Sequence, residues 1–221
     1  MTFSILAIDR DSGQIGGAAA TGSLCVGGWV LRGDIRAGLS ASQGWAPSTF
    51  WGEDVLMLMR SGAAADEAVA AVVKADSGRA WRQLSALDLA GGTGAFTGAE
   101  NTPVRGSREA AGVVVAGNLL ASETVLDAVL GGFTAAEGPL AERLIAALEA
   151  GAEAGSDSRG LLSAALLVLA PDAPPLTLRI DDHETPLAAL RRLYTRTREP
   201  FYADWLKSVP TPEDPQRHGG G

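Results

Sequence analysis

The chain has 221 residues, of which 46% are hydrophobic and 20% charged; this supports a sizeable core and excludes disorder as the main state. Its net charge is −8 and its basic residues form no cluster, so nucleic acid is not an expected partner. The single cysteine excludes an internal disulfide, no apolar run is long enough to cross a bilayer, and residues 1–6 do not resemble a secretory signal. We therefore expect a cytoplasmic protein with no membrane segment, one domain over residues 1–208 and a flexible tail over 209–221.

The predicted elements come from strand-type alternation, from helical spacing of apolar residues, and from capping residues such as Ser48 and Pro186. In chain order we expect a hairpin of strands at 2–9 and 14–21, a strand at 38–43, helices at 48–60 and 64–74, a hairpin over 81–96, a strand at 112–116, helices at 122–133 and 139–150, strands at 163–170 and 176–180, and a helix from 186 onward.

The strands fall into groups that bracket pairs of helices, whereas a doubly wound sheet would alternate strand and helix regularly. This order suits stacked sheets covered by helices on their outer faces. In the second strand, the run from Gly16 to Ala20 has only small side chains. Another backbone or a ligand can therefore approach this strand closely.

Thr2 is the first candidate for catalysis. A small residue at this position permits removal of Met1, after which Thr2 would carry both a hydroxyl and a free α-amine. An α-amine has an ordinary pKa of about 7.7–8.0, so it can serve as a base toward the neighbouring hydroxyl near neutral pH. One residue then supplies nucleophile and base. The plain alternative is that threonine is simply a common second residue in cytosolic proteins.

Several stretches, taken together and in order, resemble one family. They are residues 2–9 with 16–20, 41–43, 116–120, 157–160 running into 163–168, and 180–183 with Pro186. They resemble the uncharacterised family known as domain of unknown function 1028, within the N-terminal-nucleophile (Ntn) hydrolase superfamily. The resemblance covers most of residues 2–193 and is weaker in 21–25 and 29–36. Arg32 and Arg36 are the local basic residues that could assist an amine, and neither is assigned.

The resemblance implies an α+β fold, a four-layer αββα sandwich of the Ntn-hydrolase type in which helices cover two mostly antiparallel sheets. By superfamily it implies a hydrolase of a linear amide-type C–N bond in a small molecule, with Thr2 as the nucleophile and no cofactor. The alternative is a non-catalytic binding or structural protein that keeps this fold. Retention of Met1 would favour that alternative, because a retained methionine acylates the amine.

Asp157 and Arg159 are the strongest internal candidates for the site. They lie in a loop that enters a predicted buried strand, where they could orient the Thr2 amine or clamp a substrate carboxylate. A structural ion pair that fixes the loop explains them equally well. Asn118 follows a strand and a glycine, so its amide could donate to an oxyanion, although this is also ordinary turn chemistry.

Ser42, Gln43 and Trp45 are the expected substrate-binding residues, because they end the third predicted strand within a stretch of the resemblance. The Gln43 amide can read a polar substrate group or bond a neighbouring loop. Trp45, together with Trp29 and Trp51, can line an apolar pocket, and the alternative is a place in the core or in a subunit contact.

Two further clusters were weighed for other roles. Asp181, Asp182 and His183 are of metal-ligating types, but three adjacent residues do not easily converge on one ion, so we expect a strand end and no metal. The aromatic residues near the C-terminus fit either a homo-oligomer contact or docking of a helix on its own domain; they are Tyr194, Phe201, Tyr202 and Trp205.

Overall fold

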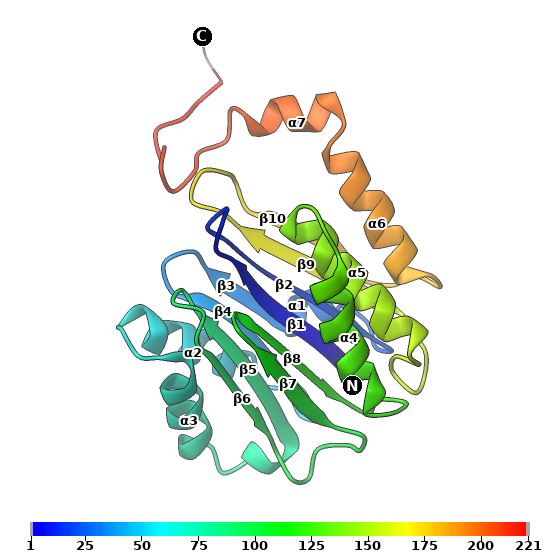
Figure 1. The fold of residues 1–221 in the computed structure, drawn as a ribbon. Coiled ribbons are helices and arrows are strands. Elements are labelled where there is room, and N and C mark those ends of the chain that lie inside the picture. The colour runs from blue at the N-terminus through cyan, green and yellow to red at the C-terminus, as the bar shows by residue number, and fades with distance from the viewer. Residues whose placement is uncertain (1, 220–221) are drawn as a thin grey trace.

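The first strand runs through the middle of the larger of two antiparallel sheets. The structure is a computed structural model that describes residues 2–219. The larger sheet has the strand order β10-β9-β2-β1-β8-β7 (Figure 1). Its strands are β1 (Thr2–Asp9), β2 (Gln14–Thr21), β7 (Gly106–Ala110), β8 (Val113–Asn118), β9 (Ser163–Leu169) and β10 (Leu176–Ile180). In this order Thr2 pairs with Thr21 on one side and with Asn118 on the other.

The smaller sheet packs face to face on the larger one. It has the order β3-β4-β5-β6. Its strands are β3 (Leu31–Asp34), β4 (Gly38–Gly44), β5 (Arg82–Asp88) and β6 (Thr93–Thr97). An apolar cluster that includes Leu6, Leu39 and Leu87 fills the space between the sheets. The two central strands β4 and β5 lie against β1, which places the end of β4 beside the start of the chain.

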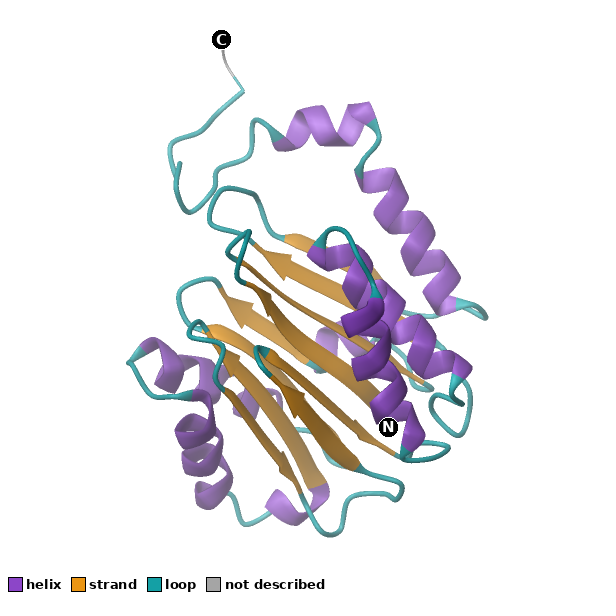
Figure 2. Ribbon diagram, in the orientation of Figure 1, coloured by secondary structure: helices purple, strands orange, loops and turns teal. Residues whose placement is uncertain are grey.

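Helices cover the outer face of each sheet and complete four layers (Figure 2). On the larger sheet lie α4 (Thr124–Ala135), α5 (Leu140–Glu153) and α6 (Pro186–Thr197), and on the smaller sheet lie α2 (Thr49–Arg60) and α3 (Ala65–Ala75). The Ser48 side chain caps α2 by accepting a hydrogen bond from the Trp51 amide, as the sequence predicts. The expected α+β sandwich of two antiparallel sheets between helices is confirmed.

Side chains on alternate positions of the central strands form three rows in the layer between the sheets. The polar row consists of Thr2, Gln43, Gln83 and Asn118. The small row consists of Ser4, Ala41, Ser85 and Ala116. The apolar row consists of Leu6, Leu39, Leu87 and Val114. All three rows are buried, so the change from apolar to polar along the layer is not a change from interior to surface.

The small residues of β2 have the predicted consequence of close approach. A Cβ built on Gly16 would lie 2.7 Å from the Leu144 side chain of α5, and one on Gly17 would lie 2.8 Å from the Leu6 side chain. Contacts this short do not occur between real carbon atoms, so larger residues would push the neighbouring layers away. Here the close neighbours are protein side chains: Leu144 of α5 at Gly16, and at Gly17 both Leu6 of the adjacent strand β1 and Leu31 of the smaller sheet, at 3.2 Å.

Short elements not expected from the sequence join the longer ones. They are α1 (Val26–Trp29), β3, the 3-10 turn η1 (Arg79–Trp81), β7 and α7 (Pro200–Leu206). α1 contains Gly-Gly, β3 is four residues long, and β7 reads Gly-Ser-Arg-Glu-Ala, so none of these carries a clear apolar period. The strands β3 and β7 form because the neighbouring strands β4 and β8 supply hydrogen bonds.

The C-terminal part of the described chain makes contacts with the sandwich. Tyr194 on α6 is buried in the outer core of the larger sheet, whereas Phe201 and Trp205 on α7 are exposed. Farther on, Thr211 is buried and the amide of Glu213 donates to the Pro171 carbonyl. The expected domain boundary at 208 stays a prediction. None of the helices within residues 2–219 combines the length and the apolar character that crossing a bilayer requires.

Candidate functional site

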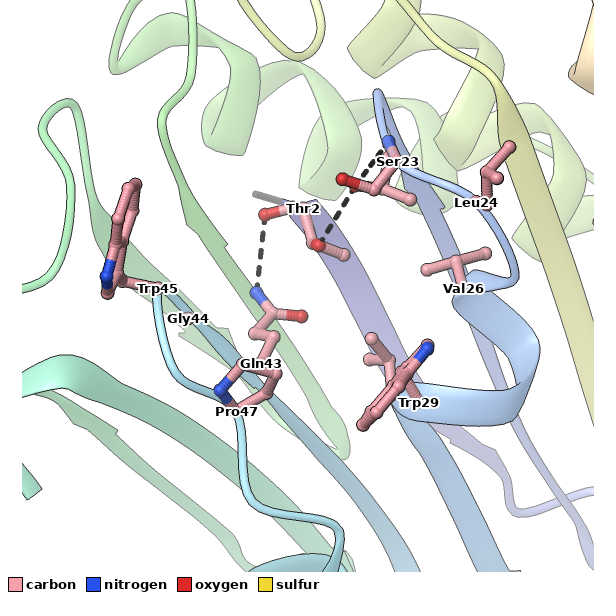
Figure 3. Close-up of a pocket in the computed structure, with 11 residues that line it drawn as sticks. Thr2, Ser23, Leu24, Val26, Trp29, Gln43, Gly44, Trp45 and Pro47 are labelled. Atoms are coloured by element: carbon pink, nitrogen blue, oxygen red, sulfur yellow. Dashed lines mark hydrogen bonds between the residues drawn. The ribbon is translucent and has the colours of Figure 1, made fainter. Parts of the chain in front are cut away.

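A cavity of about 500 Å³ opens beside the polar row (Figure 3). Its walls come from the start of β1, from the end of β2 through α1, and from the end of β4 with the segment that follows it. The lining residues are Thr2, Thr21, Ser23, Leu24, Val26, Trp29, Val30, Gln43, Gly44, Trp45 and Pro47. The cavity therefore brings together Thr2, Gln43 and Trp45, three of the residues that the sequence nominates.

The Thr2 hydroxyl is held at this cavity by the neighbouring strand. Its Oγ1 donates to Thr21 Oγ1 at 3.3 Å, and the Ser23 amide donates to the same Thr21 oxygen at 3.3 Å. Figure 3 shows Thr2 close to Ser23, and both residues line the cavity. The antiparallel register of β1 and β2, which places Thr2 opposite Thr21, produces this arrangement.

Gln43 joins the two sheets at the polar row. Its Nε2 donates to the Thr2 carbonyl at 3.3 Å and to Gln83 Oε1 at 2.7 Å. Only 1% of Gln43 is exposed, and its Oε1 has no hydrogen-bond partner among the described residues. A buried polar atom without a partner is uncommon in a native protein and marks a place where a ligand group can bind.

Asn118 lies behind the cavity and does not line it. It is fully buried, and its Nδ2 donates to Gln83 Oε1 at 3.0 Å. The structure therefore gives the Asn118 amide a place in the polar row, and its predicted role as an oxyanion donor stays a prediction.

The Asp157 carboxylate is buried and bonded to a neighbouring segment. It accepts hydrogen bonds from the Gly22 amide at 2.8 Å, from the Arg159 amide at 2.9 Å and from the Arg159 guanidinium at 2.8 and 3.0 Å. Burial alone would raise the pKa of this carboxyl, but the hydrogen bonds from Arg159 and Gly22 outweigh it and hold the pKa below its ordinary range. A Cβ on Gly22 would lie 2.5 Å from the Gly160 carbonyl, so only glycine permits this approach.

These contacts favour the structural interpretation of Asp157 and Arg159. Neither residue lines the cavity, and the four hydrogen bonds use the acceptor capacity of the carboxylate. Arg159 reaches the cavity only indirectly, through a 3.4 Å contact with the Ser23 hydroxyl. The pair holds its loop against the end of β2, next to the strand position that faces Thr2.

The described residues that line the cavity carry no formal charge. Trp29 and Trp45 are 53% and 63% exposed, and Leu24 is also exposed, so a large part of the wall is apolar surface open to a ligand. Exposed apolar surface that gathers in a concave site is typical of binding sites for small molecules. The cavity therefore suits a ligand with an apolar part.

Ser42 and Trp45 both lie within two residues of Gln43 in the sequence, but the structure places them differently. Ser42 points away from the cavity, and its hydroxyl donates to the Ser48 carbonyl at 2.7 Å beneath α2. Trp45 lines the cavity, and its amide donates to Asn101 Oδ1 at 3.0 Å, which fixes the start of the loop. Trp51 belongs to the core under α2 instead of the cavity.

Gln83 is the main site residue that the sequence does not indicate. Its side chain bonds to both Gln43 and Asn118, yet its sequence context is an ordinary hairpin strand. Arg32 and Arg36, the two basic residues near the nucleophile in sequence, do not line the cavity; Arg32 donates to the carbonyls of Leu31 and Gly28. Within residues 2–219, His, Cys, Asp and Glu form no group of three or more arranged to hold a metal ion.

Comparisons with known proteins agree on one family. The model of the family of unknown function DUF1028 matches residues 2–190. The crystal structure of protein SPO2555 from Silicibacter pomeroyi, which is assigned to the same family, is similar to this chain with a TM-score of 0.96 and 54% sequence identity. The match covers 100% of this chain and 96% of that one. No curated protein matches the chain in sequence. The chain belongs to the DUF1028 family.

Proposed function

We propose that this protein hydrolyses a linear amide-type C–N bond in a small molecule, with Thr2 as an N-terminal nucleophile after removal of Met1. The observation that carries the proposal is the placement of the Thr2 hydroxyl in the wall of a cavity of about 500 Å³. Thr2 is also the first described residue of a central strand, so its backbone is held by partners on both sides. A four-layer sandwich in which Thr2 begins the central strand β1 supports membership of the Ntn-hydrolase superfamily.

The proposed reaction uses the Thr2 hydroxyl and the α-amine that removal of Met1 frees. The hydroxyl oxygen attacks the substrate carbonyl carbon, and its proton passes to the amine. When the tetrahedral intermediate breaks down, this proton goes to the departing nitrogen, and the acyl group stays on Thr2 Oγ1 as an ester. Water then attacks the ester, a proton returns to Thr2 Oγ1 through the amine, and the carboxylic acid leaves.

One observation favours a non-catalytic binding protein as the second candidate. The side-chain nitrogen of Gln43 donates to both Gln83 and the Thr2 carbonyl, and Asn118 does not line the cavity, so neither amide is placed to donate to an oxyanion. Oxyanion donors contribute a large part of catalysis in acyl transfer, commonly about 10²–10³-fold for one donor. A protein that binds an amide without cleaving it would keep the cavity and dispense with these donors.

The test compares wild type with Thr2→Ala and Thr2→Ser in a broad screen of amides and ureides. Intact-mass measurement first establishes whether Met1 has been removed. Amide turnover by the processed wild type, a fall of about 10³-fold or more in Thr2→Ala and residual turnover in Thr2→Ser would support the proposal. Undiminished turnover in Thr2→Ala would exclude Thr2 as the nucleophile, and binding without turnover by the processed wild type would support the second candidate.

A further inference from the structure

The orientation of the Gln83 amide determines which atom Gln43 turns toward the cavity. Gln83 Nε2 lies 3.0 Å from the Gly106 carbonyl and 2.9 Å from the Gly117 carbonyl. Carbonyl oxygens only accept hydrogen bonds, so the nitrogen of Gln83 must face them and its Oε1 must face the other way. That oxygen faces Gln43 and Asn118, which must therefore both present their nitrogens to it.

Gln43 is consequently left with its oxygen as the free group. Its Nε2 is committed twice, to Gln83 Oε1 and to the Thr2 carbonyl, and both of these partners are acceptors. Turning the amide over would place oxygen against oxygen at both contacts. Figure 3 shows the Gln43 oxygen directed away from Thr2 and into the space that Trp29 borders. Gln43 lines the cavity, and its buried Oε1 is the acceptor in this wall that lacks a partner among the described residues.

This acceptor selects for ligands that carry a donor. Gln43 is nearly fully buried and its Oε1 has no partner among the described residues, so a ligand that leaves it unpaired keeps a desolvated acceptor in place. An N–H next to a carbonyl satisfies it, whereas an ester or a thioester has no hydrogen to offer.

The tryptophans complete the recognition surface. Trp29 comes from α1 and Trp45 from the segment after β4, and Figure 3 places them on different sides of the cavity. Indole rings bind flat apolar groups through their faces and edges over a large area. More than half of each residue is exposed, so these surfaces are available to a ligand.

We propose that the cavity binds primary or secondary amides or ureides, with an N–H donated to Gln43 Oε1 and a flat apolar group against Trp29 and Trp45. This substrate class rests on the proposed function, but it can be tested by binding alone. The proposal also makes Gln83 a positioning residue, because its amide orients that of Gln43.

The test uses the Thr2→Ala protein with Met1 removed, so that no ligand is consumed. Titration calorimetry compares phenylacetamide with methyl phenylacetate, which has the same ring and a carbonyl but no N–H. We expect the amide to bind at least about tenfold more tightly than the ester. Equal binding of the amide and the ester, or no binding of the amide, would overturn the proposal.

Variants locate the effect within the cavity. Gln43→Met keeps the length of the side chain without its amide oxygen and should reduce the amide-over-ester ratio to about twofold or less. Trp29→Ala and Trp45→Ala should each weaken phenylacetamide binding several-fold, whereas Trp205→Ala is a matched control because its exposed indole lies on α7. An unchanged ratio in folded Gln43→Met would contradict the proposal. If that variant does not fold, the amide-to-ester comparison in the intact cavity still decides.

The outcomes separate this inference from the proposed function. Preference for the amide without turnover in wild type would support the inference and contradict hydrolysis. Turnover that depends on Thr2 but shows no preference for amide over ester binding would support hydrolysis and contradict the inference.

Discussion

The polar row and the apolar row lie in the same layer between the same two sheets, yet they are held by different forces. Leu6, Leu39 and Leu87 in the apolar row are fully buried, and in the polar row Gln83 and Asn118 are equally buried. The apolar row needs only complementary shape to be stable. The polar row loses hydrogen bonds to water on burial, and it replaces only part of them, mainly through the shared oxygen of Gln83.

The difference between the two rows shows that the polar row contains buried groups that lower the stability of the fold. Gln43 Oε1 and Asn118 Oδ1 remain without partners among the described residues, which costs free energy that an apolar row would not lose. Unpaired groups of this kind concentrate at functional sites, where a ligand supplies the missing bond. The cavity opens at the polar row, in agreement with this interpretation.

The largest expected loss of stability comes from the apolar row. Leu39→Ala removes a fully buried side chain and should lower the free energy of unfolding by about 3 kcal/mol, because it leaves a cavity between the sheets. Urea denaturation followed by circular dichroism measures this change. Ligand affinity of the folded fraction should stay within about twofold, and a large change in affinity would mean that the two rows are not separable.

Gln83→Met tests the residue that accepts hydrogen bonds from both Gln43 and Asn118 in the polar row. It leaves the carbonyls of Gly106 and Gly117 and the Asn118 amide without their Gln83 partner, so we expect a loss of about 2–3 kcal/mol. It also frees Gln43 to turn over, and the preference for amide over ester ligands should fall.

Gln83→Glu is the matched control for orientation. It keeps an oxygen facing Gln43 while losing the donors to the two carbonyls, so stability should fall but the amide preference should survive. Loss of preference in both variants to the same degree would assign Gln83 a purely structural role. Calorimetric ratios of amide to ester affinity distinguish the two cases.

Asp157→Asn tests a buried polar group whose hydrogen bonds are all made, in contrast to the unpaired oxygens of the polar row. Breaking a buried ion pair commonly costs about 3–5 kcal/mol, but the Arg159 side chain is 39% exposed, so we expect about 2 kcal/mol. The folded-state pKa of Asp157 is lowered, so its contribution is complete above the unfolded-state pKa and is lost as the pH falls through the folded-state pKa.

Denaturation of wild type and Asp157→Asn over a range of pH checks both the size and the sign. The difference in unfolding free energy should be largest near neutral pH and should shrink below the ordinary Asp pKa of 3.8. Amide binding should change little, because Asp157 does not line the cavity. A difference that grows on acidification would contradict the assignment of the ion pair.

The smallest change in the free energy of unfolding is expected in the small row, which lies between the polar row and the apolar row. Ser4 is fully buried and its hydroxyl has no partner among the described residues, so Ser4→Ala should raise the free energy of unfolding by about 0.5–1 kcal/mol. Ser85→Ala is the matched variant on the opposite sheet, because Ser85 is only 1% exposed and its hydroxyl also has no partner among the described residues. Thermal denaturation measures both, and a loss of stability would indicate a buried water bound to the hydroxyl.

The sequence predicts most of the long elements because their signals are local. The turn at 11–13 defines the first hairpin, Ser48 caps α2, and Pro186 begins α6. The resemblance in separate stretches identifies the family, which the match over residues 2–190 confirms. Short elements such as β3 and β7 escape prediction because tertiary pairing, and not their own composition, stabilises them.

The sequence by itself determined the sandwich and the family, and it identified Thr2, Gln43 and Trp45 as candidate site residues. These predictions depend on local propensity and on residues adjacent in the chain. Only the tertiary structure decided which side chains meet at the cavity. Every residue of β4 is buried, so alternation places Ser42 and Gln43 on opposite faces without saying which face holds the cavity. Gln83 lies 40 residues from Gln43, and no local pattern indicates that its amide sets the orientation of the other.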